Sequence, residues 1–302
     1  MTAAAPRVTV CIPVHQGEGV IADCLDAVFH QTFPADQYEV VVINNGSTDR
    51  TAEVVSKYPV RVADEPRRGV GFARNACVAH ARGDLLAFTD ADCIADREWL
   101  ERLVARFDGD EGLGGVGGYL PGYDPQTPIQ YYVVERDLLS QEVALADRPY
   151  SAPFLITANA LMVRRLVEEA GGFDTAFPTN GEDADLCWRI ADKGWRFAFA
   201  PDAVVHHRHR ASVRGFCRWM FRYGQESVYL LKKHRARYGL GRVFLDGDHY
   251  RRWLAAVGRF LSPWQLGHDA WERRFAWYDV LRFSCYTAGR VAGSIKYRAI
   301  IL

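Results

Sequence analysis

Two aspartates, Asp90 and Asp92, follow a short apolar run that begins at Leu85. An apolar run of this length predicts a buried strand, and open α/β sheets bind ligands beyond the carboxyl ends of their strands. Carboxylate oxygens suit Mg²⁺ and Mn²⁺, which proteins commonly share with substrate phosphates. The pair therefore indicates a metal-bound phosphate ester. The alternative is a solvated turn in which Asp92 or Asp96 caps a helix.

A second group of acids, Glu182 and Asp183, begins a segment with helical spacing that ends before Gly194. The positive end of a helix favours the ionised form of Asp183, and an ionised carboxylate beside a substrate can act as a general base. Acids at this position are also ordinary helix caps. The pattern alone leaves both interpretations open.

The elements that must position these acids alternate between strands and helices. Such units predict parallel βαβ windings, so the loops after Val14, Ile43 and Phe88 should meet at one edge of a sheet. We expect strands at 8–14, 38–43, 60–62, 85–88, 112–118 and 196–199, and helices at 21–31, 51–58, 71–82, 99–107 and 182–193. Residues 119–152 give no clear pattern.

The composition is that of an ordinary globular protein of 302 residues with a formal net charge of zero. Seven cysteines without a Cys-x-x-Cys pair argue against a zinc cluster or a disulfide framework and favour a reducing cytoplasm. We expect no signal sequence and no spanning helix. The charge is unevenly distributed, since residues 1–202 carry a net charge of −13 and residues 203–302 carry +13. This asymmetry predicts two parts divided at residue 202.

Five motifs in sequence order resemble glycosyltransferase family 2. They are 10–13, 39–49, 71–75, 90–92 and 181–189. The resemblance implies an α/β fold of the GT-A type, a Rossmann-like mixed sheet flanked by helices, and a C-terminal helical extension. It also implies an inverting transfer from a nucleotide-sugar donor. Residues 1–202 would form the catalytic domain, with a nucleotide-binding half at about 1–93 and an acceptor half at about 94–202.

The resemblance assigns roles to individual residues. Asp183 would be the base, and Glu182 would hold acceptor or donor hydroxyls. Asp92 would be the principal ligand of Mg²⁺ or Mn²⁺, with Asp90 and His207 as further ligands, and Arg74 would contact the diphosphate. The residues expected to bind the donor are Pro13, His15, Asn44, Asn45, Arg74, Asn75, Asp90 and Ala91.

Two departures from the family pattern limit what can be predicted. Asn44 replaces the aspartate that commonly contacts the nucleobase, so the choice between UDP, GDP and dTDP stays open. Gly215 stands where processive relatives have the glutamine of a Gln-x-x-Arg-Trp motif, although Arg218 and Trp219 are present. We therefore expect single additions to an acceptor glycan, lipid or peptide that the sequence does not identify.

The basic extension at 203–302 reads as amphipathic helices. Gly289 and Gly293 have the spacing of packed membrane helices, but the charges nearby argue against a span. Three roles remain open: binding an anionic membrane surface at the inner face of the cell membrane, docking on the acidic domain, and forming a homodimer. If the extension binds a membrane surface, the acceptor would be a lipid-linked or cell-envelope glycan.

Rival functions are a nucleotidyltransferase, which also uses paired carboxylates, and a non-catalytic nucleotide-sugar-binding protein. A nucleic-acid binder has less support, because no recognised module accompanies the basic charge. We expect no nucleic-acid partner.

Overall fold

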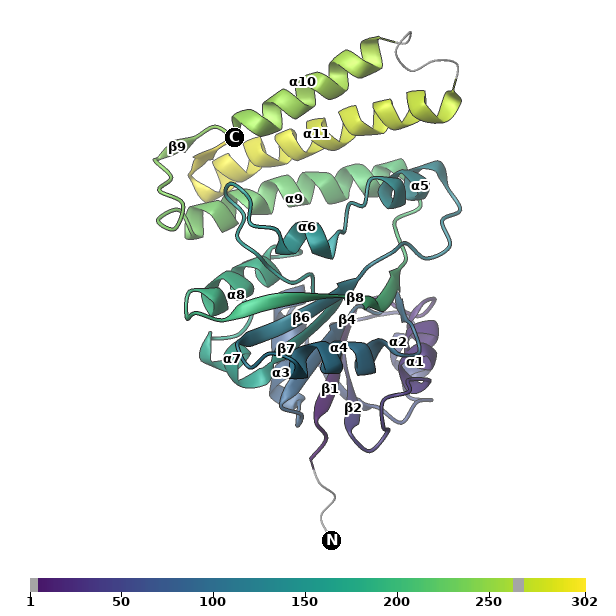
Figure 1. The fold of residues 1–302 in the computed structure, drawn as a ribbon. Coiled ribbons are helices and arrows are strands. Elements are labelled where there is room, and N and C mark those ends of the chain that lie inside the picture. Colours follow the sequence, from purple (N-terminus) through teal and green to yellow (C-terminus); the bar gives the residue numbers. More distant parts are fainter. Residues whose placement is uncertain (1–4, 263–268) are drawn as a thin grey trace. The chain divides into compact units, whose positions relative to one another are not determined.

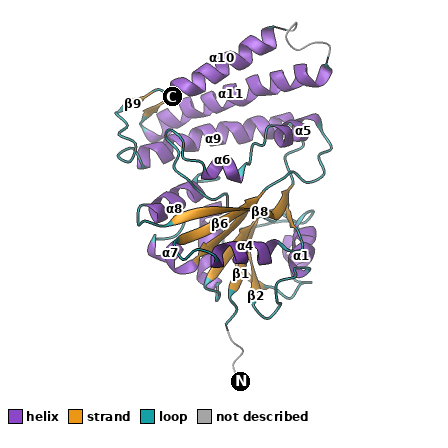
Figure 2. Cartoon of the chain, in the orientation of Figure 1, coloured by secondary structure: helices purple, strands orange, loops and turns teal. Residues whose placement is uncertain are grey.

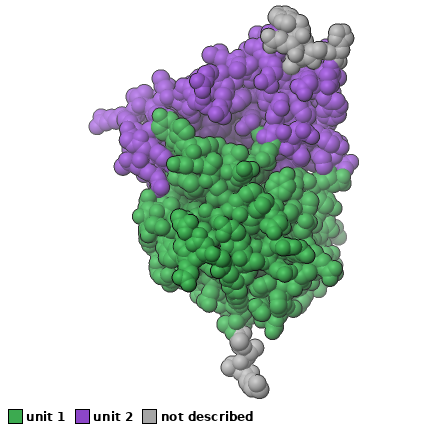
Figure 3. All heavy atoms as spheres, viewed as in Figure 1, with its two compact units in different colours: residues 1–124, 137–208 green, residues 125–136, 209–302 purple. Residues whose placement is uncertain are grey.

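The computed structural model describes residues 5–262 and 269–302 (Figure 1). It forms two compact units, coloured separately in Figure 3: unit 1 comprises residues 1–124 and 137–208, and unit 2 comprises 125–136 and 209–302. The boundary that we expected after residue 202 falls inside a strand that continues to His207. The chain divides after that strand because its last residues pair within the sheet of unit 1.

Unit 1 is built on an eight-stranded sheet with the order β3-β2-β1-β4-β7-β6-β8-β5. The strands β1, β2, β3 and β4 run parallel to their neighbours in this group, whereas β7 runs antiparallel to both β4 and β6. The last pair, β5 and β8, is also antiparallel. The bounds are β1 Val8–Val14, β2 Tyr38–Asn44, β3 Arg61–Asp64, β4 Leu85–Thr89, β5 Cys93–Ala95, β6 Leu113–Tyr119, β7 Asn159–Val163 and β8 Arg196–His207.

Helices cover both faces of this sheet (Figure 2). Alternating side chains of β1 explain the two layers: Val10 and Ile12 pack toward α1 and α4, and Cys11 packs toward α3 and α8. The helices of unit 1 are α1 Ile21–Phe29, α2 Thr51–Val55, α3 Val70–His80, α4 Trp99–Asp108, α6 Gln141–Leu145, α7 Arg164–Glu169 and α8 Glu182–Ala191. The mixed sheet flanked by helices is the expected architecture.

The strand β6 contains glycines at positions where a side chain would collide with neighbouring backbone. A Cβ at Gly118 would lie 2.1 Å from the carbonyl oxygen of Ala203, and one at Gly115 would lie 2.5 Å from that of Leu161. Only glycine allows these backbones to approach so closely. This strand was expected from the sequence. The strands β5 and β7 were not expected, because they are short and pair with distant segments.

Unit 2 is mainly helical, as expected for the extension. Its elements are α5 Pro128–Glu135, α9 Val213–Lys233, β9 Val243–Phe244, α10 Gly247–Leu261, α11 Ala270–Tyr297 and β10 Ile300–Ile301. Tyr132 of α5 is fully buried, its hydroxyl donates a 2.8 Å hydrogen bond to Asp279, and its ring meets Phe216, Phe275 and Tyr278 edge-on. A segment from the unpatterned region therefore completes the core of unit 2.

The small-residue spacing at Gly289 and Gly293 packs α11 against α9. A Cβ at Gly289 would lie 2.0 Å from the carbonyl oxygen of Phe221, and one at Gly224 would lie 2.0 Å from that of Tyr286. The two helix backbones are thus in direct contact. Among the described residues, no helix is both long enough and apolar enough to cross a membrane.

This contact yields a stability prediction with an internal control. Gly289→Ala should lower the free energy of unfolding by at least about 1–3 kcal/mol, because the added methyl group meets backbone that cannot rotate away. Gly258→Ala in α10 should raise it by up to about 1 kcal/mol, since a Cβ there meets nothing within 4 Å and alanine favours helix. Thermal and urea unfolding, followed by circular dichroism, measure both. Equal effects of the two substitutions would contradict the close packing.

Candidate active site

The loops after β1 and β2 meet at the carboxyl edge of the sheet, as the parallel windings predicted. The backbone N–H of Gln16 donates to the Ser47 hydroxyl at 3.0 Å, and the side-chain oxygen of Gln16 accepts from the backbone N–H of Thr48 at 2.8 Å. Gly17 N–H donates to the Thr51 hydroxyl at 2.8 Å. These bonds fix the two loops to each other.

Asn45 organises the neighbouring segment at 65–69. Its buried amide donates to the carbonyl oxygens of Glu65 and Arg67 at 2.8 and 2.7 Å, and its side-chain oxygen accepts from Gly69 N–H at 3.1 Å. Both amide hydrogens and one lone pair of the amide oxygen are used in these contacts. Asn45, which we expected at the donor, therefore also positions the 65–69 segment.

Asn44 and His15 lie beside it at the ends of β2 and β1. The Asn44 amide donates to an Asp64 carboxylate oxygen at 2.9 Å. His15 Nδ1 lies 3.0 Å from the Asn45 carbonyl oxygen, and its other ring nitrogen contacts the Arg68 guanidinium. The edge expected to receive the nucleobase thus presents an amide, a carboxylate and an imidazole. Pro13 lies within β1.

Arg74 is almost completely buried between two carboxylates. Its guanidinium donates to Asp90 at 3.1 Å and pairs with Glu182, whose side chain is 2% exposed. This contact joins α3, the end of β4 and the start of α8. The guanidinium was expected at the diphosphate, but the structure places it between the acids of the two motifs.

Asp183 follows Glu182 in the first turn of α8. Burial raises the pKa of its carboxyl above the ordinary value, while the Arg74 guanidinium and hydrogen bonds from backbone N–H groups oppose the rise. The expected effect of the helix start is present, but burial outweighs it. A raised pKa suits a general base, because it makes the carboxylate a stronger proton acceptor and brings its pKa closer to the operating pH.

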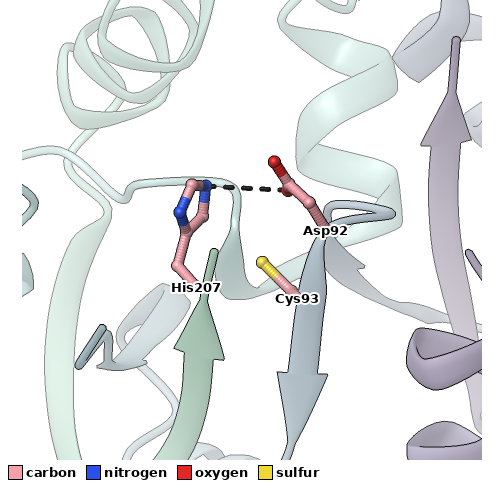
Figure 4. Close-up of side chains that lie close together, drawn as sticks. All are labelled: Asp92, Cys93 and His207. Atoms are coloured by element: carbon pink, nitrogen blue, oxygen red, sulfur yellow. Dashed lines mark ion pairs between the residues drawn. The ribbon is translucent and has the colours of Figure 1, made fainter. Parts of the chain in front are cut away.

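Asp92, Cys93 and His207 gather at the ends of β5 and β8, with potential ligand atoms within 4.8 Å of one another (Figure 4). An Asp92 carboxylate oxygen lies 3.7 Å from His207 Nε2. Antiparallel pairing sets Cys93 opposite His207, so their side chains share a face of the sheet. Asp90 pairs with Arg74 and lies outside this cluster.

A divalent cation fits Asp92 and His207 better than Cys93. Burial, together with the nearby Asp92 and Asp90 carboxylates, raises the pKa of the Cys93 thiol well above its ordinary value. Soft sulfur ligands select Zn²⁺ and Cu⁺, whereas Mg²⁺ and Mn²⁺ prefer oxygen ligands such as the Asp92 carboxylate. His206 lies on the opposite face, where its Nε2 is 3.1 Å from an Asp96 carboxylate oxygen. Alternation along the strand had predicted this separation.

Asp185 and Arg189 position other residues, although the sequence pointed to no role for either of them. Asp185 is buried and pairs with Arg189 at 2.8 Å, and Arg189 also donates to the Gly172 carbonyl oxygen at 2.8 Å. The i, i+4 spacing of the pair could have revealed it. Asn75, which we expected at the donor, exchanges two 2.8 Å hydrogen bonds between its amide and the Phe173 backbone and so anchors the loop at 173. Ala91 is buried between the two aspartates.

Residues 9–171 match the family model described as Glycosyl transferase family 2, which is more than half of the chain. Glycosyltransferase AglE of Haloferax volcanii is 31% identical over 220 residues, which are 70% of this chain and 69% of the relative. The Pre-mycofactocin glycosyltransferase of Mycobacterium tuberculosis is 29% identical over 203 residues, 65% of this chain and 43% of that protein. The match thus spans less than half of the second relative.

Two solved structures share the fold. The mannosyltransferase PcManGT from Pyrobaculum calidifontis, in complex with GDP-Man and Mn²⁺, has a TM-score of 0.66 at 24% identity and covers 96% of this chain and 87% of its own. S. aureus TarS 1-349 in complex with UDP has a TM-score of 0.53 at 17% identity, and the match covers 97% of this chain and 92% of the TarS chain. These likenesses confirm the expected GT-A fold with C-terminal helices.

The Arg74 contact should dominate the stability of this region. Arg74→Met removes the cation between Asp90 and Glu182 and should lower the free energy of unfolding by about 3–5 kcal/mol, the usual cost of leaving a buried charge without its partner. Arg102→Met is the control, because it breaks an exposed pair with Glu98 and should cost less than about 1 kcal/mol. Urea unfolding of both variants measures the difference. A cost for Arg74→Met as small as that of the control would contradict the role assigned here.

Proposed function

The chain belongs to glycosyltransferase family 2 and is a glycosyltransferase, and we propose that it transfers single sugars from a nucleoside-diphosphate donor to an acceptor hydroxyl with inversion. One observation supports the proposal above others. The Arg74 guanidinium ties Asp90, which ends the donor-side strand, to Glu182, which begins the helix that carries Asp183. The groups needed for the leaving group and for the acceptor are therefore held in one framework.

We propose that Asp92 and His207 hold Mg²⁺ or Mn²⁺. Their donor atoms, a carboxylate oxygen and an imidazole nitrogen, suit Mn²⁺ well, and their separation leaves space for an ion between them. A bound ion would neutralise the charge that develops on the diphosphate leaving group. The structural neighbour PcManGT is a complex with Mn²⁺ as well as GDP-Man, and this supports the assignment.

Asp183 is our proposed general base. In an inverting transfer its carboxylate accepts the proton of the acceptor hydroxyl as the oxygen attacks the anomeric carbon from the side opposite the diphosphate. The guanidinium of Arg74 holds Glu182 against the sheet and so orients the first turn of α8. We propose that Glu182 orients Asp183 through this contact, because its own side chain is buried.

The donor and acceptor follow from weaker observations. The two structural neighbours are complexes with GDP-Man and with UDP, and the Asn44–Asp64 pair offers both a donor and an acceptor to a base edge. A Methanococcus voltae relative, 21% identical over 75% of this chain and 74% of its own length, is named as a transferase to a dolichyl-phosphate-linked sugar. We propose a lipid-linked glycan as the acceptor.

The metal assignment predicts a difference between two adjacent histidines. His207→Ala should raise the Mn²⁺ concentration needed for donor binding roughly tenfold or more, because it removes a ligand. His206→Ala is the control and should leave this requirement unchanged, since His206 contacts Asp96 on the other face. Asp92→Asn should weaken Mn²⁺ and donor binding together. Isothermal calorimetry with nucleoside diphosphates, with and without EDTA, tests all three, and binding that ignores EDTA would remove the metal from the proposal.

The base assignment predicts that catalysis and donor binding separate on mutation. Asp183→Asn should reduce the transfer rate by about 10²–10⁴ and change donor affinity only a few-fold, because a general base acts on the acceptor. Glu53→Gln alters an exposed acid in the first turn of α2 and should affect neither. The assignment would be contradicted if Asp183→Asn transferred sugar as fast as the control variant while still binding nucleotide. Asp183 would then be only a helix cap.

A further inference from the structure

The last two long helices of unit 2 lie antiparallel (Figure 2). Along α10, His249, Trp253 and Phe260 meet progressively earlier positions of α11: His249 lies 2.8 Å from the Thr287 hydroxyl, Trp253 Nε1 donates to Ser284 at 3.0 Å, and the Phe260 ring contacts that of Trp277. These contacts define the side of α10 that packs on α11. Phe260 and Trp277 nevertheless stay 38% and 42% exposed, and other residues of both helices are also exposed.

The exposed sides carry large apolar residues. Leu254 and Leu261 of α10 lie two turns apart and are 62% and 65% exposed. On α11, Trp277, Val291 and Ile295 recur near the helical period and are 42%, 45% and 77% exposed. At about 3.6 residues per turn, Leu254 and Leu261 share one side of α10, and Trp277, Val291 and Ile295 share one side of α11. The Phe260–Trp277 contact joins the two helices where α10 ends and α11 begins. We call these residues the apolar face: Leu254, Phe260, Leu261, Trp277, Val291 and Ile295.

Basic residues accompany the apolar face. Arg251 and Arg252 of α10 share the single carboxylate of Asp248, and Arg259 lies 3.8 Å from Asp279, so basic groups outnumber acidic ones along α10. The sequence of α11 also contains more basic than acidic residues. Exposed Arg273 and Arg274 lie in its first turn, beside exposed Trp271, and the Arg274 guanidinium lies 5.7 Å from the Trp271 ring centroid. A positively charged amphipathic surface with aromatic residues is typical of helices that lie in a membrane interface.

The charges decide between possible occupants. A second copy of the chain would bring the same positive helices to the interface and so add repulsion. An acidic protein surface would pair with the arginines but would leave the leucines, Val291 and Ile295 in water. An anionic bilayer offers headgroups for the arginines and an acyl region for the apolar side chains.

We propose that the apolar face of α10 and α11 binds the surface of an anionic lipid bilayer, with both helices lying along the interface. This binding surface belongs to unit 2 alone and does not require the transfer reaction. Its arginines contact lipid phosphates, and its apolar side chains enter the headgroup boundary.

Sedimentation of the full chain with vesicles tests the proposal. Wild type should bind phosphatidylglycerol–phosphatidylcholine vesicles at low salt, bind pure phosphatidylcholine much more weakly, and dissociate as salt rises. The double variant Leu254→Glu/Leu261→Glu should lower the partition coefficient about tenfold or more, because it removes apolar insertion. Arg273→Gln/Arg274→Gln should lower it by a similar factor on anionic vesicles only.

The controls keep the outcomes distinct. Val143→Glu places the same charge on a residue of unit 1 that is 47% exposed, and it should leave vesicle binding unchanged. Donor binding by calorimetry should be unaffected in every variant. The proposal is overturned if wild type does not bind anionic vesicles at low salt. It is also overturned if Leu254→Glu/Leu261→Glu binds like wild type, or if that variant only converts a dimer to a monomer in analytical ultracentrifugation.

Discussion

The candidate site depends on one buried cation. Arg74 is buried between Asp90 and Glu182, and its contacts join α3, the end of β4 and the start of α8. A buried arginine is costly unless its partners are fixed, so the contact is stable only when the sheet and α8 are already in place. The same condition holds Asp90, which is one residue from the proposed metal ligand Asp92, and the helix that carries the proposed base Asp183 in one framework. The Arg74 contacts with Asp90 and Glu182 therefore support both the stability of this region and the geometry of the candidate site.

The second requirement is strand register. Antiparallel pairing of β5 with β8 sets His207 opposite Cys93, next to Asp92, and sends His206 to Asp96 on the other face. A shift of one residue would exchange the two histidines, because side chains alternate along a strand. The close approaches at Gly115 and Gly118 hold β6 tightly between β7 and β8, which limits such a shift. The placement of the proposed metal ligands thus depends on glycines that have no chemical role of their own.

Local patterns predicted the elements well and their partners poorly. Apolar runs identified β1, β2 and β4, and parallel windings correctly brought the loops at Gln16 and Ser47 together. The family resemblance placed Arg74 at the diphosphate, but no pattern in the sequence indicated that Asp90 and Glu182 would enclose it. The same resemblance assigned Asn45 and Asn75 to the donor, and no pattern indicated that their amides also hold the backbone of other loops. Contacts between segments about a hundred residues apart leave no periodic signal in the sequence.

The division of the chain shows the same effect in unit 2. Charge predicted a boundary near residue 202, but charge reports surfaces, whereas a compact unit is defined by its core. Tyr132 supplies the centre of that core from α5, where it bonds Asp279 and meets rings from α9 and α11. Without this segment, α9 and α11 would expose Phe216, Phe275 and an acid that has lost its hydroxyl partner. The C-terminal helices are therefore not an appended tail, because their core requires residues that precede the last strands of unit 1 in the chain.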